Sequence, residues 1–138
     1  EWGFKFHMND VSATIGLTNF KHIKTIIGKH MYNANYYNDE LNNVDGIRLL
    51  DTNGNNPAYW IYTMKVDRQK DFIKMMNSKG INVSRVHERN DIHSCASEYR
   101  TNLPEMDKIT REMISIPVGW WLSREDCEHI VNSIKGGW

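Results

Sequence analysis

The stretch Tyr59-Trp60-Ile61-Tyr62-Thr63-Met64-Lys65-Val66 is the strongest strand signal in the sequence. Aromatic and β-branched residues dominate it, and these residue types favour strands. Because successive side chains of a strand point to opposite faces, one face is expected to carry Trp60, Tyr62, Met64 and Val66. We therefore expect a strand from Tyr59 to Val66 with one apolar face.

A helix and a second strand are expected directly after this strand. Asp67 can cap the helix, and Gly80 stands where a left-handed residue commonly ends one. The inner stripe of this helix is predicted as Phe72, Ile73, Met75 and Met76. The next strand is predicted to begin at Ile81, since Ile81, Val83 and Val86 are β-branched.

Upstream, the pattern predicts one long amphipathic helix and a short strand. The turn-rich loop Asp51–Pro57 separates the short strand Ile47–Leu50 from the strand at Tyr59. After a cap at Asn9 or Asp10, apolar residues recur at threes and fours as in a helix. They are Val11, Ile15, Phe20, Ile23, Ile27, Met31, Ala34, Tyr37 and Leu41.

Downstream, a short helix opens at Leu103-Pro104 and a fourth strand covers 114–118, where Pro117 favours a sheet edge or a strand end. A capping-box pattern at Ser123–Asp126 opens the last helix, whose buried stripe is predicted as Cys127, Ile130, Val131 and Ile134. The predicted fold class is α+β: a long N-terminal helix followed by a small, mainly antiparallel sheet with helices on one face.

Composition narrows the classes of function. The chain has 138 residues and a formal net charge of zero, so it offers no electrostatic case for nucleic acid or an anionic membrane. It holds no apolar run of bilayer-spanning length. Its two cysteines, Cys95 and Cys127, lie in unlike contexts, which favours reduced thiols and a cytoplasmic location.

The polar run after Ile81 is the candidate site. Six polar side chains fall within seven positions: His87, Glu88, Arg89, Asn90, Asp91 and His93. A strand that leads into such a run can hold these groups at the mouth of a site. The alternative is a solvated turn. His87, His93 and Cys95 lack the paired spacing of metal ligands, so no metal site is expected, and no residue is assigned as catalytic.

Several motifs, taken in order, resemble one family. The segment Gly3-Phe4-Lys5-Phe6-His7-Met8-Asn9-Asp10 resembles the start of the conserved stretch of the DegT/DnrJ/EryC1/StrS sugar aminotransferases. Further similar motifs are Tyr36–Leu41, Lys79–Ser84, Leu103-Pro104, Ile114–Pro117 and Leu122–Asp126. Together they cover essentially the whole chain.

The resemblance implies the small domain of a fold-type I enzyme that depends on pyridoxal 5′-phosphate (PLP). Residues 1–42 would be the end of the large domain and the linking helix, and residues 43–138 the small C-terminal domain. In the family, a large N-terminal domain carries the PLP-binding lysine, and its motifs are absent from this sequence, which starts at Glu1. We therefore expect the C-terminal part of such an enzyme, inactive alone, with no PLP bound covalently to this chain.

The implied reaction is amino transfer from glutamate to a keto sugar linked to a nucleotide, in a homodimer. A minority branch of the family dehydrates the sugar instead, and this sequence does not choose between the two. By resemblance, Lys5 and His7 would contact the cofactor phosphate of the neighbouring subunit. Substrate would be bound by His87, Arg89, Asn90, Asp91 and His93. A local ion pair between Arg89 and Asp91 is the alternative there, and a free-standing, non-catalytic ligand-binding or interaction domain is the alternative for the whole chain.

Overall fold

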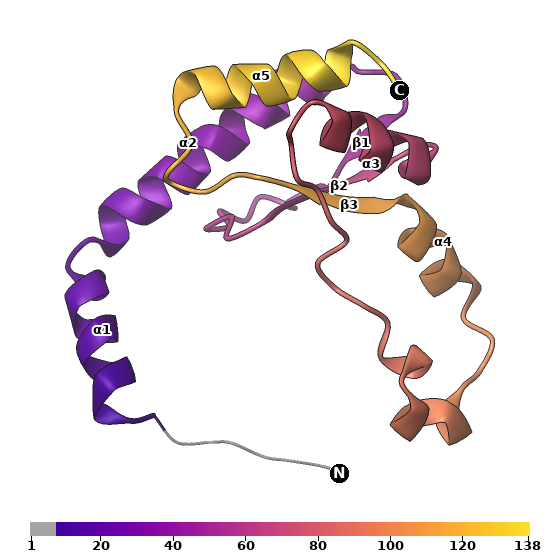
Figure 1. Ribbon diagram of the computed structural model, residues 1–138, viewed down its shortest axis with the longest axis horizontal. Coiled ribbons are helices and arrows are strands. Elements are labelled where there is room, and N and C mark those ends of the chain that lie inside the picture. The colour runs from indigo at the N-terminus through magenta and orange to yellow at the C-terminus, as the bar shows by residue number, and fades with distance from the viewer. Residues whose placement is uncertain (1–7) are drawn as a thin grey trace.

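The computed structural model describes residues 8–138. Its elements follow the chain as an open, curved arrangement, with α1 at one end and a projecting segment between α3 and α4 at the other (Figure 1). The helices are α1 (Asp10–Phe20), α2 (Ile23–Leu41), α3 (Gln69–Ser78), α4 (Pro104–Glu112) and α5 (Arg124–Lys135). The strands are β1 (Ile47–Leu49), β2 (Tyr62–Val66) and β3 (Met113–Ile116), and two short 3-10 helices are η1 (Asn90–Ile92) and η2 (Ser94–Tyr99).

The three strands form one antiparallel sheet in the order β1-β2-β3. Met64 of β2 lies opposite Leu49 on one side and Ile114 on the other, so apolar side chains of all three strands share a face. The opposite face is polar, and there the hydroxyls of Thr63 and Ser115 lie 3.0 Å apart. The predicted α+β class with an antiparallel sheet is confirmed.

Helices α2, α3 and α5 supply the rest of the core. Each contributes fully buried side chains to the cluster that includes the apolar sheet face: Ala34, Tyr37 and Leu41 from α2, Phe72 and Met76 from α3, and Cys127, Ile130, Val131 and Ile134 from α5. The predicted stripe of α5 is therefore buried. Its capping box is present, with Ser123 and Asp126 each accepting from the other's backbone N–H.

The prediction of one long N-terminal helix is wrong in one respect: the segment forms two helices, α1 and α2. The two helices are separated by Lys21 and His22, and the chain leaves helical geometry at His22, which has φ −104° and ψ 1°. No residue of α1 is buried among the described residues, so α1 gains no core contact that would hold it in line with α2. Periodicity predicted the helical conformation of this segment but not its continuity.

The predicted strand at Ile81 is also wrong. Ile81 and Val83 are buried, but the segment pairs with the sheet only through an isolated bridge between Ser84 and Ser115. Val86 has a φ of +57°, a left-handed conformation that turns the chain away from β3. The sheet therefore has three strands, and Ser84 extends it by one residue.

The strand predicted from Tyr59 begins three residues later, at Tyr62. Tyr59 has a φ of +49°, so the chain turns there instead of continuing as a strand. Trp60, expected on the same strand face as Tyr62, Met64 and Val66, lies outside the strand and is 69% exposed. Within residues 8–138, no helix is both long and apolar enough to cross a bilayer.

Candidate functional site

The polar run begins at a tight turn. After the bridge at Ser84, the backbone N–H of His87 donates to the carbonyl of Arg85 at 2.6 Å, with Val86 between them in its left-handed conformation. A β-branched residue with positive φ is a strained outlier, and such strain is concentrated at functional sites. This turn sets the direction in which the polar run leaves the sheet.

A second strained residue faces this turn from the loop before β2. Tyr59 is left-handed, and its carbonyl lies 2.7 Å from Nδ1 of the buried His30 on α2. The residue after Tyr59 is Trp60, whose ring meets the ring of His87 edge to face, with centroids 6.0 Å apart. Each strained residue thus directly precedes one member of the Trp60–His87 pair.

Arg89 is held by two carboxylates. Its Nε and one terminal nitrogen donate to the two oxygens of Asp91, at 2.8 and 2.6 Å, and its other terminal nitrogen contacts Asp107 of α4. The hydrogen bonds from Arg89 lower the pKa of the Asp91 carboxyl below its ordinary value. The ion pair considered as the alternative for these residues is therefore present, and a diphosphate would have to displace it to reach the guanidinium.

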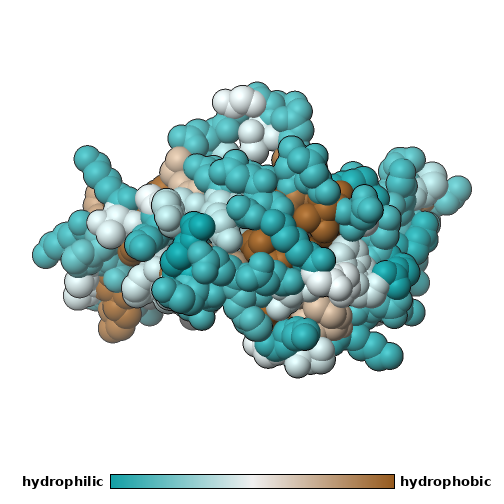
Figure 2. All heavy atoms as spheres, turned by 90° about the horizontal axis from the view of Figure 1, so that it is seen from above, coloured by the Kyte–Doolittle hydropathy of each residue, from teal (hydrophilic) through white to brown (hydrophobic). Residues whose placement is uncertain are grey.

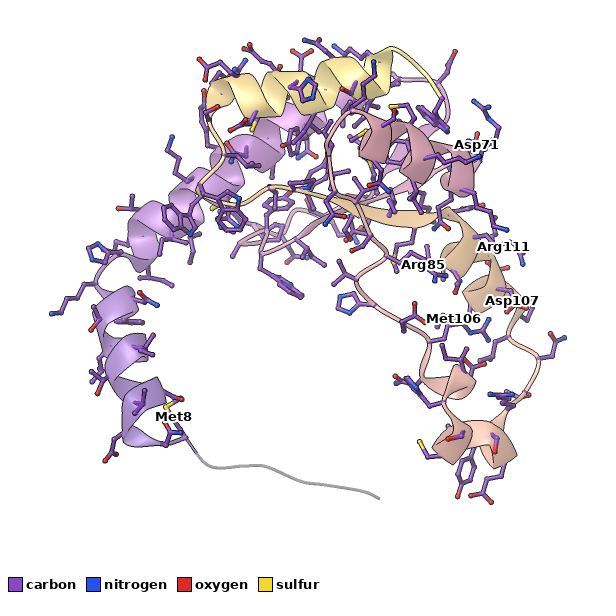
Figure 3. All side chains as sticks on the ribbon, viewed as in Figure 1. Met8, Asp71, Arg85, Met106, Asp107 and Arg111 are labelled. Carbon is purple, nitrogen blue, oxygen red and sulfur yellow. The ribbon has the colours of Figure 1, made fainter. Side chains whose placement is uncertain are left out.

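These contacts order a projecting segment, residues 88–103, which we call the arm (Figure 1). Arg100 donates to the backbone carbonyls of Asp91 and Ile92, at 2.5 and 2.8 Å, and so closes the arm on itself. Figure 3 labels Asp107 on α4, the helix that follows the arm and leads into β3. It also labels Arg85, which lies shortly before the arm begins. Two arginines thus give shape to a segment with no buried residue.

The predicted substrate-binding residues are accordingly placed in three groups. Arg89 and Asp91 bind each other, while His87 lies beside Trp60. Asn90 and His93 are exposed at the ends of η1, where the N–H of His93 donates to the carbonyl of Asn90 at 3.3 Å. The predicted cofactor residues Lys5 and His7 lie outside the described residues.

A hollow of about 410 Å³ opens beside Trp60. It is bounded by the loop between β1 and β2, by the start of β2 and by α2, and its lining includes Asn38, Asp51, Thr52, Tyr59, Trp60 and Tyr62. The sequence prediction missed this hollow, because it read 51–57 as a turn-rich loop and Trp60 as part of a continuous strand. Three aromatic residues within four positions, after a polar loop, were the signal that pointed to it.

Burial fixes the polar groups at the base of this hollow. The Tyr62 hydroxyl donates to Oδ1 of Asn38 at 2.7 Å, and burial raises the pKa of that hydroxyl. Tyr59 and Tyr62 stack with ring centroids 6.0 Å apart. Among residues 8–138, no three His, Cys, Asp or Glu side chains are grouped so that they could hold a metal ion.

The fold is similar to that of solved sugar aminotransferases. The chain belongs to the DegT/DnrJ/EryC1/StrS aminotransferase family, whose sequence profile matches residues 1–135. The structure is similar to the sugar aminotransferase CalS13 from Micromonospora echinospora, with a TM-score of 0.92 and 38% identity, over 100% of this chain and 38% of CalS13. It is also similar to AtS13 from Actinomadura melliaura, with a TM-score of 0.88 and 41% identity, over 100% of this chain and 37% of AtS13.

This chain also matches only part of the length of a curated relative. The erythromycin biosynthesis sensory transduction protein EryC1 of Saccharopolyspora erythraea is 21% identical over 141 residues, which are 98% of this chain and 38% of EryC1. The chain therefore spans well under half the length of the relatives it matches.

Proposed function

We propose that this chain forms the C-terminal part of a nucleotide-sugar aminotransferase, with residues 1–42 leading from the large domain and residues 43–138 forming the small domain. The observation that carries the proposal is the likeness of the whole chain to the sugar aminotransferase CalS13, at a TM-score of 0.92 and 38% identity. A long helix followed by a small domain that packs against it is the architecture expected of that part of the enzyme.

The reaction proposed for the whole enzyme moves an amino group from glutamate to the keto carbon of a nucleotide-linked sugar, leaving 2-oxoglutarate and an amino sugar. When bound, PLP supplies the electron sink for this chemistry. Among the described residues, no lysine lines the hollow at Trp60, so we assign no covalent PLP attachment there. Lys5 and His7 have the donor chemistry that suits the cofactor phosphate of a neighbouring subunit.

The arm is proposed as one wall of the entrance for the sugar nucleotide. Asn90 and His93 are exposed on it and His87 is exposed just before it, and all three can donate hydrogen bonds to a sugar or a diphosphate. Arg89 and Asp91 hold the arm in shape through their bidentate pair. We infer that these two act by positioning the exposed side chains.

Helix α1 supports the proposal that more protein covers this chain. Large apolar side chains are exposed along it: Val11, Ile15, Leu17 and Phe20. They are spread around the helix instead of forming one stripe, and a helix that is apolar on all sides is normally buried. From above, a hydrophobic patch stands apart at the end of the molecule that α1 occupies (Figure 2). We propose that the large domain of the enzyme and the partner subunit of a homodimer cover these side chains of α1.

The test is an assay of the protein encoded by the complete reading frame that contains these residues. Purified with PLP, it should form 2-oxoglutarate from glutamate only when a nucleotide-linked 3-keto or 4-keto sugar is added. Omitting the sugar is the control for glutamate turnover by itself. If no keto sugar nucleotide in the panel supports 2-oxoglutarate formation, or if the sugar is consumed without glutamate, the proposal of amino transfer is wrong.

A further inference from the structure

We propose that the hollow beside Trp60 binds the nucleobase of the substrate, with the indole of Trp60 as the stacking surface. The inference rests on the proposed function, since a nucleotide-linked sugar is what brings a base to this chain. Trp60 was not among the residues predicted to bind substrate, and no motif in the sequence assigns it this role.

The chemistry of the lining selects for an uncharged aromatic group. Among the described residues that line the hollow, Asp51 alone carries a formal charge, and that charge is negative. A phosphate would be repelled there, whereas a neutral base would not. The rings of Tyr59 and Trp60 offer apolar faces on which a base can stack, and Tyr59 is itself stacked on the buried ring of Tyr62.

Polar groups at the same place can meet the edge of a base. The Asn38 amide oxygen is occupied by the Tyr62 hydroxyl at 2.7 Å, which leaves Nδ2 as the donor of that amide. On the loop, Asn55 donates its Nδ2 to the carbonyl of Thr52 at 2.9 Å, which leaves its side-chain oxygen as an acceptor. A donor and an acceptor fixed beside an aromatic surface are what recognition of a base requires.

The position of Trp60 is held at a cost in backbone strain. Bulky residues rarely take the left-handed conformation, yet Tyr59 does so, and His30 holds its carbonyl at 2.7 Å. The indole is nevertheless 69% exposed, so this strain does not serve core packing. An exposed ring that is fixed by a strained neighbour and by contact with His87 is pre-organised for a ligand.

The geometry also connects the hollow to the arm. Trp60 borders a second hollow of about 220 Å³, which is also lined by Ser84, Val86 and Trp121. A base seated on Trp60 therefore lies next to the turn from which the arm departs. The sugar and diphosphate of the same molecule would then extend toward His87 and toward His93 of the arm.

The test compares ligand affinities in the whole protein by isothermal titration calorimetry. The probes are UDP, dTDP, GDP and ADP, with inorganic pyrophosphate and ribose 5-phosphate as probes that lack a base. In Trp60→Leu, the affinity for the nucleoside diphosphate that binds most tightly should fall roughly tenfold, the usual size of a lost stacking contact. Affinity for the two probes without a base should stay unchanged, and Trp60→Phe should recover most of the loss.

The matched control is Trp120→Leu, which removes another exposed tryptophan that lies outside both hollows. It should leave all affinities unchanged. The inference is overturned if no nucleoside diphosphate binds, if Trp60→Leu leaves their affinities unchanged, or if it weakens pyrophosphate equally. These measurements need no turnover, so failure of the stacking proposal is distinguishable from failure of amino transfer.

Discussion

Arg89 binds Asp91 through two parallel hydrogen bonds, from Nε to Oδ1 at 2.8 Å and from a terminal nitrogen to Oδ2 at 2.6 Å. The two side chains are 17% and 22% exposed, and the remaining terminal nitrogen of Arg89 contacts Asp107. One guanidinium therefore links the start of the arm to α4. Bidentate pairing of this kind fixes geometry as well as contributing energy.

We expect Arg89→Ala to loosen the arm without unfolding the domain. Amide hydrogen exchange should accelerate at least tenfold in residues 90–100, while the amides of β2 and α5 keep their protection, because the arm contributes no buried side chain to the core. Arg85→Ala is the matched control, since it removes only the exposed pair with Glu88, whose atoms are 3.1 Å apart. Equal exchange in both variants would contradict the role assigned to Arg89.

The same pair makes the order of the arm depend on pH. Hydrogen bonds from Arg89 lower the pKa of Asp91 below its ordinary value of about 3.9. A lowered pKa means that the ordered arm binds this proton less readily than the loosened arm does. Its contribution is therefore fully present above the ordinary value, and it is lost as pH falls through the pKa of the ordered state.

We accordingly expect the arm to begin losing order as the solution is acidified below about pH 4, and to be mobile once the pH lies below the pKa of Asp91 in the ordered arm. Backbone order parameters from NMR, measured for residues 90–100 between pH 3 and pH 6, check this. Asp91→Asn has no carboxyl group at this position, so its arm should be mobile already at pH 6. An Asp91→Asn arm that is as ordered at pH 6 as the arm of the unmodified protein would rule out the proposed linkage.

Tyr37 provides a prediction about the core. Its ring is fully buried, and its hydroxyl donates to the carbonyl of Pro117 at 2.9 Å, with the Cys127 sulfur 3.5 Å away. Tyr37→Phe leaves that carbonyl without this donor, and an unsatisfied buried acceptor costs about 1–3 kcal/mol. Urea unfolding should show a lower midpoint with an unchanged slope.

Tyr62→Phe is the comparison for that measurement. Its hydroxyl donates to Asn38 at 2.7 Å, and both residues line the hollow, from which water can replace the lost donor. We expect a smaller loss there, about 0.5–1.5 kcal/mol. If Tyr62→Phe lowers the free energy of unfolding more than Tyr37→Phe does, the hydrogen bond to Pro117 does not stabilise the fold more than the one to Asn38.

The elements that the sequence predicted well depend on local patterns. Phe72 and Met76 mark the inner side of α3 by spacing alone, and Ser123 with Asp126 marks the start of α5 by capping chemistry. Gly80 is left-handed as expected at the end of α3. In each case, residues a few positions apart contain the whole signal.

The misplaced elements depend on contacts between distant segments. Tyr59 turns out of the strand and is held by His30, which lies 29 positions earlier. Ser84 pairs with Ser115 for one residue only, because Val86 redirects the chain. No local pattern encodes either contact, and the site missed by the sequence, at Trp60, is the place where these two segments meet.

Arg89 has one partner nearby in the sequence and one distant partner, and only the nearby one could be predicted. The pairing with Asp91 was open as an alternative from sequence, since the two residues lie two positions apart. The contact with Asp107 spans 18 positions and depends on how α4 packs after the arm. Sequence reasoning therefore found the residues of the arm but not the contact that anchors them.

The apolar surface of α1 gives a prediction about association. Ile15 is 57% exposed and Leu17 is 71% exposed, on a helix that buries none of its residues in the described chain. At 25 cal/mol per Å² of apolar surface removed from water, covering such side chains strongly favours association. We expect the 138-residue chain to self-associate at high concentration in sedimentation velocity experiments.

Replacing Ile15 and Leu17 with Glu should shift the chain toward monomer, because charged groups on this surface resist burial. The matched control is Thr18→Glu, which adds a charge to the same exposed helix without removing an apolar side chain. Circular dichroism should show the same helical content in all variants, since α1 lies outside the core. A clean monomer at high concentration in the unmodified chain would contradict the proposal that another part of a larger protein covers α1.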